Sequence, residues 1–313
     1  MNIKSIISND LGIPEKLIEE ALSSSRTYVK VFKIKKRNGG FREIHHPSKK
    51  LKTLQYWLIH NIFKNLSIHK SSVAYQDGVS ILDNAKMHSS NRFFLKIDLE
   101  NFFPSIKYTD LEPIVDKWHS ENKISWELDQ EAKELIRKSC FYKEDLLPIG
   151  YPSSPIISNA VMHDFDTAIN QIILDNRFGE TVYTRYADDL VFSTNKHGAC
   201  SKLKDVIRTF IGGYNTPNIK INTSKTKMGS STGGSASVTG LKVCENGHIT
   251  IHRKQKDHIR LLLSLYAKGK LPESEKSSLA GHLAYVQHVA PSFYSSISNK
   301  YFKEIFELRA TNV

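Results

Sequence analysis

The chain has 313 residues, of which 40% are hydrophobic and 24% charged, and its 44 Lys and Arg outnumber its 32 Asp and Glu by 12. This hydrophobic share argues against a disordered chain and allows one large domain or two or three subdomains. No apolar run approaches the roughly 20 residues of a membrane-spanning helix, and three widely spaced cysteines fit a cytoplasmic protein without disulfides. The positive excess favours a polyanionic partner, nucleic acid before membrane.

The positive charge is concentrated near the N-terminus, where residues 26–52 hold ten basic residues and one acid. Residues 29–35 alternate apolar and basic side chains, residues 38–40 supply turn chemistry, and residues 41–44 resume the alternation. This pattern predicts a β-hairpin with a basic surface. We expect that hairpin to bind phosphates.

The rest of the chain alternates helices and strands. Periodicity predicts helices over residues 13–24, 108–117, 126–140, 158–174 and 202–211, and strands over residues 92–99, 219–221 and 236–243. Residues 181–193 place β-branched and aromatic side chains around an acidic pair, which is typical of a hairpin. After residue 252 the chain is helical and basic again, with ten basic residues against five acids.

Acidic residues stand at strand ends, which is unexpected in a cationic protein. Asp98 closes an apolar strand, and Asp188 and Asp189 occupy a hairpin tip 90 residues later. Bringing three carboxylates together is costly unless a cation joins them, and Mg²⁺ prefers such oxygen ligands. Two such ions would support phosphoryl transfer. Taken alone, Asp98 could instead cap a helix, and the acidic pair could be an ordinary turn.

In chain order, these pieces resemble the motifs of a reverse transcriptase. The matching blocks are KRNGG…Q at residues 36–55, DLENFF at 98–103, LPIGYPSSP at 147–155, YADD at 186–189 and NTSKT at 222–226. Five blocks in the family's order make chance agreement untenable. The resemblance implies an α+β fold of right-hand polymerase architecture. Its parts would be an N-terminal helix and fingers over residues 1–90, a palm with an antiparallel sheet, helices and interleaved fingers elements over 91–245, and a helical thumb over 246–313.

The resemblance also implies a catalytic role for the three acids. Asp98 and Asp188 would bind two Mg²⁺ ions together with the Leu99 carbonyl, and Asp189 would hold or orient the metal on the primer side. The primer hydroxyl would then attack the α-phosphate of a deoxynucleoside triphosphate.

Six further residues would bind that nucleotide. Lys36 and Arg42 of the basic hairpin would hold the triphosphate, and Phe103 would lie under the sugar and exclude a ribose. Lys225 would add charge near the leaving pyrophosphate. Ile149 and Gly150 would border the nucleotide, but Ile149 stands where the family usually has Gln. Because Ile cannot donate a hydrogen bond, we expect weaker nucleotide binding or altered fidelity.

Two short motifs resemble those of bacterial retron reverse transcriptases: NAxxH at residues 84–88 and VTG at 238–240. By themselves they could be a polar pair on a helix and a strand with its turn. The resemblance implies an RNA-binding role, shared with the basic thumb, for Asn84, Ala85, His88, Val238, Thr239, Gly240, Arg253 and Lys254. It further implies a cognate structured non-coding RNA that serves as template and as 2′-OH primer, and a branched RNA–DNA product (msDNA). Anti-phage defence with a separate effector protein is also implied.

Two other functions remain open from the sequence. One is a reverse transcriptase of another bacterial lineage, such as a CRISPR-associated or diversity-generating type. The other is a catalytically idle scaffold that holds RNA and silences a toxin.

Overall fold

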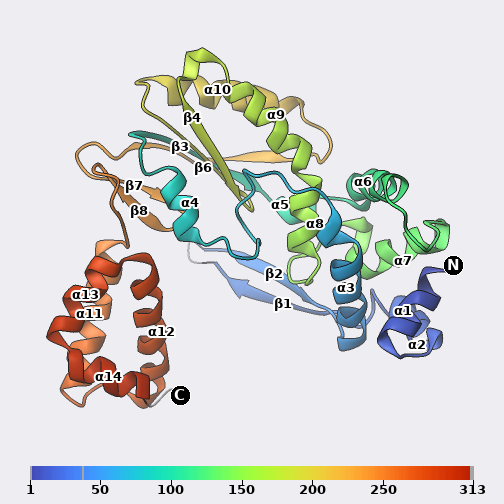
Figure 1. The fold of residues 1–313 in the computed structure, drawn as a ribbon, viewed down its shortest axis with the longest axis horizontal. Coiled ribbons are helices and arrows are strands. Elements are labelled where there is room, and N and C mark those ends of the chain that lie inside the picture. Colours follow the sequence, from blue (N-terminus) through green and yellow to red (C-terminus); the bar gives the residue numbers. More distant parts are fainter. Residues whose placement is uncertain (1, 37–38, 311–313) are drawn as a thin grey trace.

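The computed structural model describes residues 2–36 and 39–310 as a chain of helices and antiparallel strands (Figure 1). The N-terminus forms two helices, α1 (Ile3–Leu11) and α2 (Glu15–Ser23), where the sequence predicts only one over residues 13–24. The Asn2 side chain caps α1, and Gly12 ends it in the left-handed region at φ 63°. That glycine separates the two helices, because other residues adopt this conformation at a cost.

The predicted basic hairpin is present. Strands β1 (Lys30–Lys35) and β2 (Phe41–His46) pair antiparallel, with Lys35 opposite Phe41. Residues 37 and 38 at the predicted turn lie outside the described residues. Helix α3 (Lys49–Asn61) follows, and the Ser48 hydroxyl caps it by accepting from the Leu51 N–H.

The central sheet is antiparallel and has the order β4-β5-β3-β6. Its strands are β3 (Phe93–Glu100), β4 (Thr181–Tyr186), β5 (Asp189–Thr194) and β6 (Lys220–Ser230). The sequence predicts β6 only over residues 219–221. Most of this edge strand is polar and at least partly exposed, so it lacks the hydrophobic alternation on which a strand prediction rests.

Helices pack against this sheet and beside it. They are α4 (Ile81–Met87), α5 (Phe102–Ser105), α6 (Tyr108–Glu121), α7 (Gln130–Cys140), α8 (Ser154–Val161), α9 (His163–Ile173) and α10 (Ala199–Gly213), with short 3₁₀ turns at Phe63–Asn65, Lys143–Asp145 and Asn176–Phe178. The helix predicted over residues 158–174 is in fact α8 and α9, which meet at Met162. Met162 carries no residue-type signal for a helix break, so the sequence does not mark it.

The strand predicted over residues 236–243 is wrong. The chain turns there at Thr239 (φ 44°) and Gly240 (φ 85°), which gives the hairpin β7 (Ser235–Val238) and β8 (Leu241–Cys244), joined by β9 (Ile249–Thr250). Thr is uncommon at positive φ, which explains why the pattern concealed this turn. The C-terminal bundle follows as α11 (Arg253–Ala267), α12 (Glu273–Val289), α13 (Pro291–Lys300) and α14 (Phe302–Ala310).

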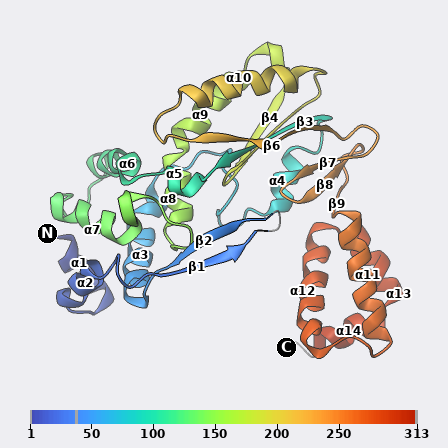
Figure 2. The ribbon, with the colours of Figure 1, turned by 180° about the vertical axis from the view of Figure 1, so that it is seen from behind.

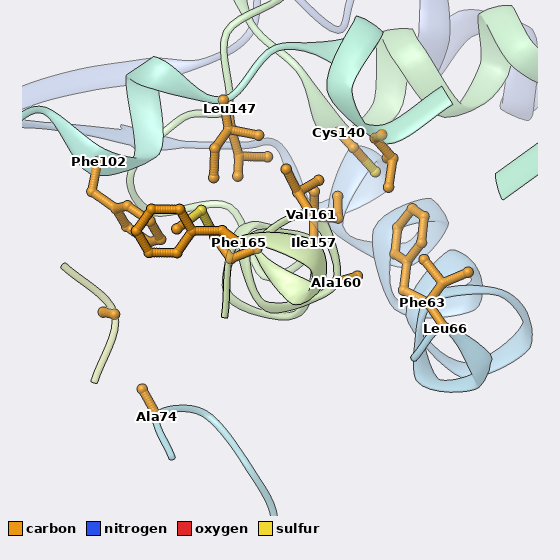
Figure 3. Packing of buried hydrophobic residues seen from close by; sticks show 14 of the residues in the cluster. Phe63, Leu66, Ala74, Phe102, Cys140, Leu147, Ile157, Ala160, Val161 and Phe165 are labelled. Carbon is orange, nitrogen blue, oxygen red and sulfur yellow. The ribbon is translucent and has the colours of Figure 1, made fainter. Parts of the chain in front are cut away.

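Two hydrophobic clusters hold the molecule together. In the first, Ile157, Ala160 and Val161 of α8 lie between Leu147 and Phe63 (Figure 3). The second joins the C-terminal helices to β7 and β8, and it also includes Ala85, Phe94 and Val191. The C-terminal bundle lies at one end of the molecule and α1 and α2 at the other (Figure 1). The three-part division at residues 90 and 245 stays a prediction. Within the described residues, no helix is both long and apolar enough to cross a bilayer.

A fully buried ion pair underlies the central sheet. The Arg185 guanidinium donates to both Asp166 carboxylate oxygens at 2.7–3.0 Å, and the side chains of both residues are 0% exposed. The Tyr183 hydroxyl donates to the same carboxylate at 2.7 Å. The pair therefore fastens α9 to β4, the strand that leads to the acidic hairpin tip.

Removing one member of this pair should destabilise the fold strongly. The substitution Asp166→Asn leaves a buried guanidinium without a counter-charge, which should lower the free energy of unfolding by about 3–5 kcal/mol. Asp257→Asn is the control, because Asp257 forms a half-exposed pair with Arg260 and should change stability by less than about 1 kcal/mol. Denaturant unfolding of both variants measures the difference, and equal losses would contradict the assignment.

Candidate active site

The three predicted catalytic acids come together at one end of the central sheet. Asp98 on β3 lies opposite Asp189 on β5 in the antiparallel register. Tyr186 pairs with Asp189, so Ala187 and Asp188 form a two-residue turn, in which Ala187 has φ 55°. The Leu99 N–H donates to the Asp188 carbonyl at 2.9 Å and ties the turn to β3. Register and turn together bring the acids into one place.

Electrostatics at this place show an excess of negative charge. Burial, reinforced by the charges of Asp189 and Asp98, raises the pKa of the Asp188 carboxyl. Two lysines partly offset this repulsion. Lys225 Nζ lies 3.0 Å from the Asp98 carboxylate, and Lys96 Nζ lies 2.8 Å from that of Asp189. The role of Lys225 beside the pyrophosphate stays a prediction; in this structure its ammonium group pairs with Asp98.

Lys96 is a residue that the sequence analysis missed. It stands two positions before Asp98 on β3, so the two side chains share a face of the sheet. That spacing was the available signal. Its chemical consequence is that each of the two paired carboxylates has its own ammonium group.

A cleft of about 980 Å³ opens in front of the acids. It is lined from the sheet side by Asp98, Leu99 and Asp188, and it also contains every residue predicted to bind the nucleotide: Lys36, Arg42, Phe103, Ile149, Gly150 and Lys225. Lys36 and Arg42 belong to the basic hairpin, so cationic and acidic walls border the same space. Asp189 lies beside it, held by the register with Asp98.

Gly150 allows the basic hairpin to pack closely against the segment that contains Ile149. The His45 N–H on β2 donates to the Ile149 carbonyl at 2.8 Å. Gly150 has φ 107°, and a Cβ at this position would lie 2.6 Å from the His45 carbonyl oxygen. Only glycine permits both the conformation and this approach. Ile149 therefore contributes through its backbone to the position of β2.

Tyr75 is a second residue that the sequence analysis missed, and no sequence signal marks it. It has φ 59°, lines the cleft, and lies between two aromatic rings, with centroid distances of 6.3 Å to both Phe103 and Tyr186. Burial, together with the charge of Asp188, raises the pKa of its hydroxyl. Only the folding of the preceding loop against β4 brings this ring to Phe103.

The residues predicted to contact RNA fall into two groups. Asn84, Ala85, His88 and Val238 are all 0% exposed, and their side chains pack within the protein. By contrast, Gly240, Arg253 and Lys254 are exposed, and Thr239 is half-buried. Direct RNA contact stays a prediction for all eight, but in this structure the buried group faces the protein interior.

Comparison with known proteins identifies the family. Residues 34–262 match the family described as reverse transcriptase (RNA-dependent DNA polymerase). The chain is also 40% identical to the retron Ec73 reverse transcriptase of Escherichia coli, over 97% of this chain and 96% of that protein. It belongs to the retron reverse transcriptases. A second relative, the retron Ec83 reverse transcriptase of E. coli, is 32% identical over 89% of this chain and 88% of its own length.

Solved structures agree on the fold. The apo telomerase of Candida tropicalis superposes with a TM-score of 0.52 at 14% identity, covering 91% of this chain and 61% of that one. At this identity the likeness concerns the fold alone. The predicted right-hand polymerase architecture is confirmed, and the protein is an RNA-directed DNA polymerase rather than an idle scaffold. Membership in the retron family also decides against the CRISPR-associated and diversity-generating lineages.

Reverse transcriptases generally use divalent metal ions, and the acids of this retron enzyme suit that use. Three carboxylates supply hard oxygen ligands, and burial, reinforced by the charges of Asp189 and Asp98, raises the pKa of Asp188. Within residues 2–36 and 39–310, no three His, Cys, Asp or Glu side chains already form a metal-binding cluster. Two of the three carboxylates form ion pairs with lysines: Asp98 with Lys225 and Asp189 with Lys96.

The close approach at Gly150 can be tested by adding one methyl group. Gly150→Ala places a Cβ against the His45 carbonyl and in a strained conformation, so the free energy of unfolding should fall by about 1–3 kcal/mol. The KM for deoxynucleotide should rise because β2 moves out of position. Gly212→Ala is the control, since a Cβ there meets no atom within 4 Å. Denaturant unfolding and steady-state kinetics provide the measurements; unchanged values for Gly150→Ala would refute the packing argument.

The raised pKa of Asp188 predicts how the stability of the protein depends on pH. Because the pKa of this carboxyl is higher in the folded state than its ordinary value of 3.8, the folded protein binds more protons in that range. The free energy of unfolding of the metal-free enzyme should therefore contain a component that falls as pH rises above about 4. Asp188→Asn should remove this component and stabilise the protein at neutral pH.

The measurement is denaturant unfolding in EDTA between about pH 4 and 7. Asp175→Asn is the opposite control, because hydrogen bonds from Arg177 lower the pKa of the Asp175 carboxyl. That substitution should remove stability at neutral pH. A loss of stability in Asp188→Asn would contradict the charge assignment.

Proposed function

We propose that this enzyme copies a cognate structured non-coding RNA that serves as both template and primer. Synthesis begins at the 2′-OH of an internal guanosine and yields branched msDNA. The observation that carries the proposal is the cleft, because Asp98 and Asp188, two residues of the basic hairpin and the other predicted nucleotide-binding residues all line it. Membership in the retron family supports the choice of RNA.

The cationic wall suits a triphosphate. Lys36 and Arg42 line the cleft from the hairpin side, where Arg can bind two phosphate oxygens at once and Lys acts as a point charge. Phe103 packs edge-on against Phe102 at a centroid distance of 5.3 Å, which fixes its ring. A rigid ring under the sugar disfavours a ribose 2′-OH, because the hydroxyl would lose its water without gaining a partner.

The acidic wall suits two Mg²⁺ ions. Asp98 and Asp188 would hold both, with the Leu99 carbonyl, and Asp189 would orient the ion on the primer side. When bound, the ions would activate the attacking hydroxyl and stabilise the leaving oxygen. Metal binding would break the ion pairs of Lys225 with Asp98 and of Lys96 with Asp189. Lys225 could then face the triphosphate.

The RNA surface follows the exposed positive charge. Arg253, whose side chain is 92% exposed, and the exposed Lys254 begin α11 next to the β7–β8 hairpin. Such residues bind duplex RNA through phosphates and shape. We place this activity in the cytoplasm, whose reducing conditions suit three free cysteines. A separate effector protein would convert it into anti-phage defence.

Replacing the acidic pair tests the proposal. Asp188→Asn combined with Asp189→Asn should abolish dTTP incorporation on poly(rA)·oligo(dT) while RNA still co-purifies, because catalysis needs the charges and RNA binding does not. Asp205→Asn on α10, whose carboxylate is 72% exposed, should leave both unchanged. DNA synthesis by the double variant would refute the metal assignment.

Sequencing the nucleic acid that co-purifies with the wild-type enzyme tests the choice of substrate. The expected product is one defined RNA joined through a guanosine 2′-OH to DNA. A mixture of unrelated RNAs without branched DNA would contradict self-priming and leave the polymerase activity itself intact.

A further inference from the structure

Helix α4 connects the catalytic hairpin to the hairpin that leads into the thumb. It lies beside β7 and β8 when the molecule is seen from either side (Figures 1 and 2). It carries Asn84 and Ala85, and His88 follows it as the C-cap. These are the three specified residues of the NAxxH motif, and all three are 0% exposed. Buried polar side chains are costly unless they are hydrogen-bonded, so their partners define their role.

His88 binds both strands of the catalytic hairpin. Its Nδ1 lies 2.7 Å from Ser193 Oγ on β5, and its Nε2 lies 2.8 Å from Thr184 Oγ1 on β4. These are the two strands whose connecting turn contains Asp188. One imidazole therefore joins the strands across the sheet face that α4 covers.

Donor counting fixes the direction of these hydrogen bonds. Thr184 Oγ1 donates its proton to Asn84 Oδ1 at 2.7 Å, so it must accept from a proton on His88 Nε2. Ser193 Oγ accepts from Asn91 Nδ2 at 2.9 Å and has its own proton free for His88 Nδ1. Burial lowers the pKa of His88 to about 4, which agrees with a neutral ring. Only the tautomer with the proton on Nε2 satisfies every group.

The chain of hydrogen bonds continues to the turn between β7 and β8. Asn84 Nδ2 donates to Thr239 Oγ1 at 3.5 Å, and Thr239 Oγ1 donates to the Ile81 carbonyl at 3.4 Å. Thr239 forms the turn between β7 and β8. On the apolar side, Ala85 belongs to the same hydrophobic cluster as Val238 and the thumb helices. The two retron motifs are thus hydrogen-bonded to each other inside the protein.

We infer that Asn84 and His88 are positioning residues for polymerisation, which hold the catalytic hairpin in a fixed relation to the base of the thumb through the chain His88–Thr184–Asn84–Thr239. They act within the protein and do not contact RNA. Because the thumb cluster and the catalytic turn share this connection, a shift of β7 and β8 reaches Asp188 and Asp189 through α4. This inference rests on the polymerase activity alone and does not depend on the nature of the RNA.

The experiment compares His88→Leu, His88→Gln and Thr239→Val with the wild type. The readouts are kcat for dTTP incorporation on poly(rA)·oligo(dT) and the Kd for the same duplex by fluorescence anisotropy. His88→Leu should lower kcat about tenfold or more, because a small displacement of catalytic groups is costly, while Kd stays within about twofold. His88→Gln should recover most of the rate, because the Gln amide can both donate and accept a hydrogen bond. Thr239→Val should lower kcat less.

Coupling is tested by the double variant His88→Leu with Thr239→Val, which should be no slower than His88→Leu alone. Ser89→Ala is the matched control, since the Ser89 hydroxyl donates to the Lys86 carbonyl of α4 and takes no part in this chain of hydrogen bonds. Circular dichroism checks folding; if His88→Leu does not fold, His88→Gln with Thr239→Val replaces it in the cycle. Additive losses of rate would overturn the inference. So would a Kd that weakens as much as kcat falls, because that result would mean direct contact with nucleic acid.

Discussion

The antiparallel register of β3 and β5 is the constraint on which the site depends, because it sets Asp98 opposite Asp189. Like charges facing each other across a sheet repel, and Asp188 at the adjoining turn adds to the repulsion. The protein offsets this cost locally with Lys225 and Lys96. Beneath the same sheet, the buried pair of Arg185 and Asp166 holds β4 in place. The buried ion pair thus supports the strand that leads into the negatively charged turn at Asp188.

The opposite wall of the cleft is held by backbone contacts. The basic hairpin is largely exposed and gains little from its own burial. Its anchor is the hydrogen bond from His45 to Ile149 and the close approach that Gly150 permits. The motif around Gly150 therefore has a structural role beside any role in nucleotide binding. It sets the distance between the cations of the basic hairpin and the carboxylates.

The catalytic hairpin and the β7–β8 hairpin are linked through α4. Its polar residues bind the catalytic hairpin, and its apolar residue Ala85 packs in the thumb cluster. A polymerase must keep its duplex-binding part aligned with its catalytic acids through each cycle. A helix whose buried face carries a satisfied polar network suits this purpose, because such a network permits one arrangement and penalises others.

The sequence alone determined the chemistry and much of the architecture. The YADD hairpin, the strand that ends near Asp98 and the basic hairpin all follow from local alternation and turn residues, which operate over a few positions. The sequence could not determine the turn at Thr239, the break at Met162 or the length of β6, because packing overrides weak local preferences there. Nor could it determine that Lys96 binds Asp189, that Tyr75 joins Phe103, or that Asn84 and His88 are buried. Those facts depend on contacts between segments up to 155 residues apart, and only the tertiary structure creates them.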